Sequence, residues 1–334
     1  MSVLSAQYPT MLDIASRLDP DGKKVATIIE MLSAMNPILQ DMVVQECNNK
    51  TVHKSTIRTG LPGATWRKMY GGVQPDKSET AQIQDSCGML EAYSQIDKAQ
   101  ADLAPDKSGF LASESVSFLE GMSQEMANTL FYGDQEVTPE RFTGLSPRYN
   151  SYGNSKRKSS YNVINAGGTG STNTSLWFCT WSPLTMFGLY PAGGKAGFSH
   201  EDLGRQTVTK SDGSMYEVYR SHYLWYLGLC VRDWRYNVRV ANIDVNALES
   251  GSAADLLQLM IKAYHRMPSL NTGKHVIYCN RTVATALDIQ ARQAKNVILN
   301  YSEVDGHPQT SFRGIPIRVC DALLDTEAAV PAAV

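Results

Sequence analysis

The sequence lacks the features that usually mark secreted, membrane-spanning and nucleic-acid-binding proteins. Its N-terminus, MSVLSAQYPTMLDIASRLDP, does not have the charged-then-apolar order of a signal peptide. No apolar run approaches the roughly 20 residues of a membrane span. The formal net charge of −2 argues against a protein whose main task is electrostatic binding of nucleic acid. We therefore expect a protein that is made in a cytoplasm and stays soluble until it meets its partners, with no membrane among them.

Cysteine and histidine are too widely spaced to suggest a metal site. None of the cysteines forms a CxxC pair, and most lie in apolar runs such as LWFCTW, which predicts buried, reduced thiols. HEDLG at 200–204 resembles the start of a zinc-protease helix but lacks the second histidine. His275 and Cys279 bracket a predicted strand, which places them too far apart to share a metal ion. We expect no metal and no other cofactor.

Catalytic motifs are also missing. There is no GxSxG nucleophile elbow. The loop NAGGTGSTN at 165–173 is rich in glycine, but a phosphate site needs a helix next, and the residues that follow, TSLWFCTW, have the composition of a strand. We expect a flexible turn there, with a nucleotide-using enzyme as an alternative that Gly168→Val would test. The basic stretch SKRKSS at 155–160 is expected to be a solvated loop, with contact to a phosphate backbone as its alternative.

The chain has enough apolar residues to form a hydrophobic core. The chain has 334 residues, of which 43% are apolar and 19% charged. A helical stripe in DGKKVATIIEMLSAM predicts an N-terminal arm. A long helix of roughly 35–40 Å is predicted next, with Asp106 or Ser108 as its N-cap and Gly133 at its end. From about 160 to 245 the pattern is mostly β, and an α/β segment follows. In it Ser252 and Asn280 are expected to cap two helices, with Asp255 at the third helical position of the first. SFRGIPIRVCDAL is predicted to form one final strand. The predicted class is α+β.

The stretch TGLPGATWRKMYGGVQPDKSETAQIQDS at 59–86 is the least usual part of the chain. It carries Trp66, Met69 and Tyr70 among glycine, proline, serine and threonine. Together with the strand-like segments on either side it predicts a long two-stranded excursion, and an isolated hairpin of that kind is marginal in water. Exposed elements of this type are useful where a neighbouring molecule supplies the missing surface. We therefore expect this ribbon to lie on an adjacent copy of the chain.

Several stretches, in their order, resemble the major capsid protein of tailed bacteriophages, in particular a subgroup found in short-tailed podophages. No single stretch is diagnostic, but the likeness extends over nearly the whole chain. The stretches are IRTGLPGATWRKMYGGVQPDKS (57–78), QEMANTLFYGD (124–134), FTGLSPRYNS (142–151), INAGGTGSTNTSLW (164–177), KAGFSHEDLG (195–204), WRYNVRVANID (234–244) and SFRGIPIRVCDALLDTE (311–327).

The resemblance implies a tailed-phage major capsid protein fold. It comprises an N-terminal arm, an extended β loop, a peripheral domain with a long spine helix and an axial α/β domain. The approximate bounds are 1–50 for the arm, 51–98 for the extended loop, 99–240 and 310–330 for the peripheral domain, and 241–309 for the axial domain. By the same resemblance, assembly contacts are expected at Arg58, Trp66, Arg67, Lys68 and Tyr70 in the extended loop.

The function implied is structural and not enzymatic. Subunits would form hexamers and pentamers that close into an icosahedral shell around double-stranded DNA, without sequence-specific binding. The shell would assemble in the host bacterial cytoplasm, with scaffolding, portal and decoration or cement proteins as further partners. A shell protein of a bacterial encapsulated protein compartment, which uses the same fold, is the alternative.

Overall fold

The computed structural model describes residues 36–60, 62–249, 255–293, 299–304 and 307–333. The predicted helical stripe at 21–35 and the predicted cap Ser252 lie outside the described residues. The described chain forms two compact units. One comprises Met89–Glu125 and Gly197–Trp225, and the other comprises the remaining described residues.

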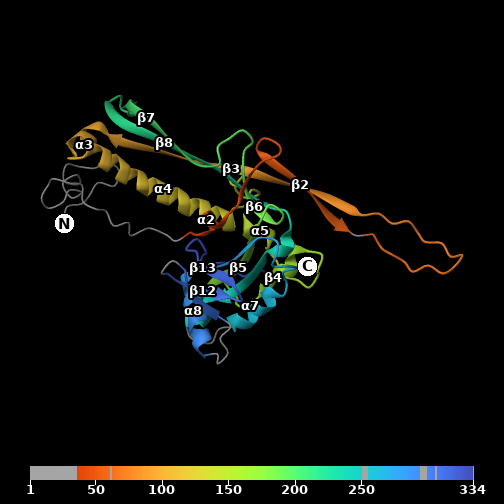
Figure 1. Ribbon diagram of the computed structural model, residues 1–334. Helices are drawn as coiled ribbons and strands as arrows, with labels where there is room; N and C mark the ends of the chain where they lie inside the picture. The colour runs from red at the N-terminus through yellow and green to blue at the C-terminus, as the bar shows by residue number, and fades with distance from the viewer. Residues whose placement is uncertain (1–35, 61, 250–254, 294–298, 305–306, 334) are drawn as a thin grey trace. The chain divides into compact units, whose positions relative to one another are not determined.

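Helices and strands are grouped unevenly along the chain, with a run of strands from β4 to β8 (Figure 1). The helices are α2 Ile38–Asp41, α3 Lys98–Leu103, α4 Lys107–Tyr132, α5 Leu145–Arg148, α6 Val245–Glu249, α7 Leu256–Tyr264 and α8 Arg281–Gln293, with 3-10 turns η1 Ser159–Asn162 and η2 Trp234–Tyr236. The strands are β1 Val44–Glu46, β2 Val52–Gly60, β3 Glu79–Asp97, β4 Val163–Asn165, β5 Asn173–Trp181, β6 Met186–Tyr190, β7 Gly197–Thr209, β8 Met215–Val231, β9 Val238–Asp244, β10 Lys274–Cys279, β11 Leu299–Val304, β12 His307–Phe312 and β13 Ile315–Val319. The predicted α+β class is confirmed.

The larger unit is organised around β5, all of whose residues are buried. Strand β5 pairs antiparallel with both β9 and β10, and β10 pairs parallel with β13. On one face, side chains from α7 and α8 form a common apolar core with Leu176 and Phe178 of β5. On the other face, Trp177 packs against Phe131 and Tyr149, with ring centroids 6.3 and 5.7 Å apart. A strand covered on both faces reads as a continuous apolar run, which is why SLWFCTW was recognisable in the sequence.

The smaller unit is held together by aromatic stacking on Tyr223 of β8. The rings of Phe118, Phe198 and His200 stack on it with centroid distances of 5.5, 5.8 and 4.9 Å. The Tyr223 hydroxyl donates a hydrogen bond to Ser115 Oγ over 3.0 Å. These contacts join α4, β7 and β8. Strand β7 is not among the strands that the sequence predicts, although its first residues belong to the stretch KAGFSHEDLG that resembles phage capsid proteins.

The long helix predicted from the sequence is present as α4, which has 26 residues. Asp106 Oδ1 accepts the backbone N–H of Gly109 at 3.1 Å, as expected for a residue at the start of the helix. The helix ends where expected, since Gly133 N–H donates to Thr129 O at 2.8 Å. A Cβ at Gly133 would lie 2.5 Å from Phe142 O, so a residue without a side chain is required there.

Two sequence expectations about the C-terminal half need correction. Helix α7 begins at Leu256 and is capped by Asp255, whose side chain accepts the backbone N–H of Gln258, so Asp255 is the cap and not an interior residue of the first turn. The segment SFRGIPIRVCDAL forms two strands and not one. Its chain reverses at Arg313 and Gly314, which have φ angles of 51° and 82°, and β12 then pairs antiparallel with β13.

Candidate assembly surface

The extended loop has a regular base. Strands β2 and β3 pair antiparallel from Val52↔Ser86 to Gly60↔Glu79, with an irregularity in register between Arg58 and Gly60. The predicted two-stranded excursion is therefore confirmed. Beyond the paired region the two strands give way to an irregular segment, residues 62–78, that Figure 1 shows projecting past the ends of β2 and β3. We call residues 62–78 the loop tip.

A buried ion pair fixes the base of the extended loop. Arg148 Nη2 lies 2.7 Å from Asp85 Oδ1 of β3, and the Asp85 side chain is almost entirely buried. The same Arg148 nitrogen donates to the carbonyl oxygen of Leu229 at 3.1 Å. Arg148 and Asp85 are 63 positions apart, so nothing in the sequence pointed to this contact. It holds the base of the extended loop, whereas no ion pair joins the loop tip to another described residue.

The loop tip presents large apolar side chains to solvent. Trp66 and Tyr70 have exposed fractions of 101% and 103%, and Met69 is 90% exposed. Burying such side chains is worth about 1.5–3 kcal/mol each, so leaving them in water forgoes a large stabilisation. No other aromatic side chain among the described residues is exposed to this extent. Exposed apolar patches of this kind are typical of interaction surfaces.

Backbone hydrogen bonds give the loop tip a defined local conformation. Asp76 accepts the backbone N–H of Gly63 at 2.6 Å and that of Lys77 at 2.8 Å, and these bonds hold the pKa of the Asp76 carboxyl below its usual value. A turn closes with Gly71 N–H donating to Lys68 O at 3.0 Å, and Tyr70 has a positive φ of 62°. Asp76 is not among the residues expected from the sequence to matter in the loop, although aspartate is frequent in such turns.

The structure brings together four of the five residues expected to make assembly contacts. Trp66, Arg67, Lys68 and Tyr70 lie in the loop tip and all are exposed. Arg58 belongs to β2, near the end of the strand that leads into the loop tip, and its side chain is outside the described set. Within the described residues, neither Arg67 nor Lys68 forms a salt bridge, so both cations are available to a partner.

The glycine-rich loop does not have the geometry of a phosphate site. Residues 166–172 connect β4 to β5, and no helix follows. Gly167 and Gly170 have φ angles of 98° and 84°, and a Cβ at Gly168 would lie 2.4 Å from Asn173 Oδ1. The glycines therefore serve backbone conformation and close packing.

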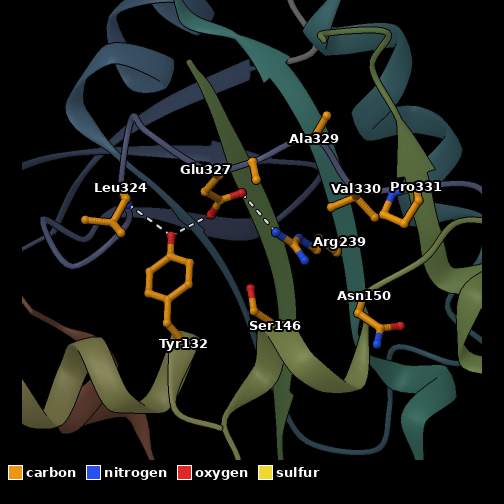
Figure 2. A pocket seen from close by; sticks show the side chains of 10 residues that line it. Tyr132, Ser146, Asn150, Arg239, Leu324, Glu327, Ala329, Val330 and Pro331 are labelled. Atoms are coloured by element: carbon orange, nitrogen blue, oxygen red, sulfur yellow. Dashed lines mark hydrogen bonds and ion pairs between the residues drawn. The ribbon is translucent and has the colours of Figure 1, made fainter. Parts of the chain in front are cut away.

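A pocket of about 300 Å³ lies beside the C-terminal segment (Figure 2). Its charged members, Arg239 and Glu327, are buried and paired with each other at 2.9 Å. Glu327 also accepts hydrogen bonds from Tyr132 and Ser175, and Tyr132 in turn accepts the backbone N–H of Leu324. Burial and the nearby Glu327 carboxylate raise the pKa of Tyr132 far above its ordinary value. These charges are neutralised internally, so the arrangement fixes the C-terminal segment.

The remaining candidate groups are the cysteines, the possible metal ligands and the basic stretch at 156–158. All six cysteines are free thiols, and Cys87 is the least buried of them. Among the described residues there is no cluster of metal-ligating side chains, and no helix is long and apolar enough to cross a bilayer. The basic residues Lys156, Arg157 and Lys158 are exposed in a turn, as expected of a solvated loop.

The sequence was compared with protein families and with solved structures. The model of the family described as "Major capsid protein GP7" matches residues 19–331. The chain belongs to the major capsid protein GP7 family. A major capsid protein of this kind forms the icosahedral shell of a tailed, Epsilon15-like podophage, and it is a structural component of the virion, not an enzyme. The phage-capsid interpretation is thereby confirmed over the bacterial-compartment alternative.

The chain is similar to the structure of bacteriophage Epsilon15, with 36% identity, 99% of each chain covered and a TM-score of 0.77. This likeness shows the HK97-like major capsid protein fold. The capsid of bacteriophage JBD30 is 9% identical, with 88% of this chain and 92% of that chain covered and a TM-score of 0.48. The holo-SrpI encapsulin complex from Synechococcus elongatus PCC 7942 is 9% identical, with 70% and 95% covered and a TM-score of 0.44. Because these two scores are low, the assignment rests on the family match and on Epsilon15. A search of curated proteins found no match.

Proposed function

We propose that the major capsid protein joins its neighbours in the shell by laying the loop tip onto an adjacent subunit. The observation that carries this proposal is the near-complete exposure of Trp66, Met69 and Tyr70 on a segment whose base is fixed. Aromatic side chains and arginine are the residues that most often dominate the energy of protein interfaces. Arg67 and Lys68 add cations that a carboxylate on the neighbouring subunit can pair with.

The proposal extends to the organisation of the subunit. Residues 1–50 serve as an arm along an adjacent subunit, and 51–98 as the extended loop. Residues 99–240 with 310–330 form the peripheral domain, and 241–309 the axial domain. Subunits arranged as hexamers and pentamers close the shell. Further partners are a scaffolding protein, a portal and a decoration or cement protein.

The enclosed partner is double-stranded DNA, held without sequence-specific contacts. The formal net charge of −2 supports this, because a strongly basic inner wall would bind the phosphate backbone tightly and a strongly acidic one would repel it. Assembly takes place in the host bacterial cytoplasm.

The test is a triple variant of the loop tip. We expect Trp66→Ala, Arg67→Ala and Tyr70→Ala together to abolish fast-sedimenting particles while leaving a folded subunit, because these side chains have no intramolecular packing to lose. Particles are counted by sedimentation and negative-stain microscopy, and folding is measured by circular dichroism.

The matched control replaces three exposed apolar residues outside the loop tip: Val137→Ala, Leu184→Ala and Met215→Ala. It should assemble as the unmodified protein does. Intact shells from the loop-tip variant would contradict the proposal, and failure of both variants would show that assembly responds to any loss of apolar surface.

A further inference from the structure

Two cysteines meet at the base of the extended loop. The Sγ atoms of Cys47 and Cys87 are 3.2 Å apart, although the residues are separated by 40 positions in the chain. Their backbones are held independently. Cys47 N–H donates to Tyr190 O at 2.9 Å, and Cys87 N–H donates to Thr51 O at 3.0 Å. These backbone hydrogen bonds therefore hold the two cysteines beside each other.

The surroundings favour this pair over other thiol pairings. A Cβ at Gly228 would lie 3.2 Å from Cys87 Sγ, so the absent side chain leaves room for the thiol. Cys230, the other cysteine of the same apolar cluster, has its Sγ 3.8 Å from Ser55 Oγ. Among the described cysteines, Cys47 and Cys87 form the one pair whose sulfur atoms are recorded in direct contact.

We propose that Cys47 and Cys87 form an intramolecular disulfide in the mature, released particle. The bonded distance is about 2.05 Å, so the sulfur atoms must approach each other by about 1 Å. The co-reactant is a low-molecular-weight disulfide. One cysteine thiolate attacks it and releases one small thiol, and the second cysteine thiolate then displaces the other. Two protein thiols lose their protons and become one disulfide, while the small disulfide is reduced to two thiols.

The chemistry places this reaction after the particle leaves the host. Cytoplasmic glutathione keeps protein thiols reduced, whereas an extracellular environment is oxidising. Burial raises the pKa of both thiols, and at Cys87 the contact with Cys47 raises it further. Few thiolates are present at neutral pH, so oxidation is slow. The disulfide does not depend on the proposed docking of the loop tip. Only its formation after release from the host rests on the proposed function as a phage capsid protein assembled in the cytoplasm.

The consequence is a covalent closure around the extended loop. The bond would link the segment after β1 to β3 and enclose β2 together with the whole loop tip. Closing a loop of this length reduces the conformational freedom of the unfolded chain. We therefore expect oxidised protein to melt at a higher temperature than reduced protein, with no change in the shape of the particle.

The test is peptide mapping of both folded subunits and assembled particles after exposure to oxidised glutathione. Free thiols are alkylated, the protein is digested without reductant, and linked peptides are identified by mass spectrometry. We expect one linked peptide containing Cys47 and Cys87, and a higher melting temperature that reductant reverses. Cys47→Ser and Cys87→Ser, each tested separately, should lose both, while the buried-thiol control Cys320→Ser should keep both.

Complete alkylation of both cysteines after prolonged oxidation would overturn the proposal. A linked peptide joining Cys87 to Cys230, or joining two subunits, would also overturn it. Because folded subunits are measured alongside particles, the result is independent of whether the loop-tip variant assembles.

Discussion

At the scale of single residues, one buried carboxylate fixes the C-terminal segment. Glu327 is paired with Arg239, and both side chains are only 5% exposed. Arg239 Nη1 also donates to Tyr149 O at 3.0 Å, and its guanidinium lies over the Trp177 ring. A buried charge pair contributes little net stability over an apolar pair, but removing one member leaves the other charge uncompensated.

Arg239→Met should therefore destabilise the subunit strongly, by about 3–5 kcal/mol, because Glu327 is left as an unpaired buried carboxylate. The double variant Arg239→Met with Glu327→Met should recover part of that loss. Chemical denaturation of the dissociated subunit measures both.

The matched control for that prediction is Arg281→Met. Arg281 pairs with Asp321 at 2.7 Å, but the arginine side chain is 67% exposed. An exposed pair is worth about 0–1 kcal/mol, so the loss should be correspondingly small. Equal losses at Arg239 and Arg281 would contradict the assignment of Glu327 as a charge that needs its partner.

At the scale of secondary structure, the sequence predicted those elements whose apolar spacing and capping residues lie close together in the chain. Helix α4 was predicted with both its ends, because every signal for it lies in the helix or directly beside it in the chain. These signals are the apolar spacing, Asp106 just before the helix and Gly133 just after it. Helix α8 and its cap Asn280 were predicted for the same reason, and Val283 N–H donates to Asn280 Oδ1 at 2.8 Å.

Strand β7 was missed because its burial is mostly intermediate or exposed, so its residues show no strong alternation. Its stability comes from Phe198 and His200 stacking on Tyr223, which lies more than twenty positions away. The ion pairs Arg148–Asp85 and Arg239–Glu327 were beyond prediction for the same reason, since their members meet only in the folded chain. In the candidate site, the exposed aromatic residues were predicted from composition, whereas the Asp76 turn was not.

The cap of α7 gives a test at this scale. Asp255→Ala should lower stability by about 1 kcal/mol, because the backbone N–H of Gln258 loses its acceptor. Gln258→Ala, which keeps that N–H and changes only an exposed side chain, should have little effect. The comparison uses denaturation of the dissociated subunit. If Asp255→Ala has no larger effect than Gln258→Ala, the cap has been assigned to the wrong residue.

At the scale of the whole molecule, the subunit combines a well-packed α/β core with a loop tip that has nothing of its own to pack against. Helices α7 and α8 and the strands around β5 share one apolar core of buried side chains. The loop tip keeps Trp66 and Tyr70 in water. The family to which the chain belongs forms a capsid shell. By our proposal, an adjacent subunit in that shell supplies the surface that the loop tip lacks.

The most direct test is to ask what the loop tip touches in the assembled shell. A photo-reactive benzophenone amino acid is placed at Tyr70, particles are purified and irradiated, and the products are separated under denaturing conditions. We expect cross-linked dimers and higher species from particles, but not from dissociated subunits or from particles carrying the probe at Val137. Cross-links confined to the same chain, or none at all from intact particles, would contradict the account that the loop tip lies on an adjacent subunit.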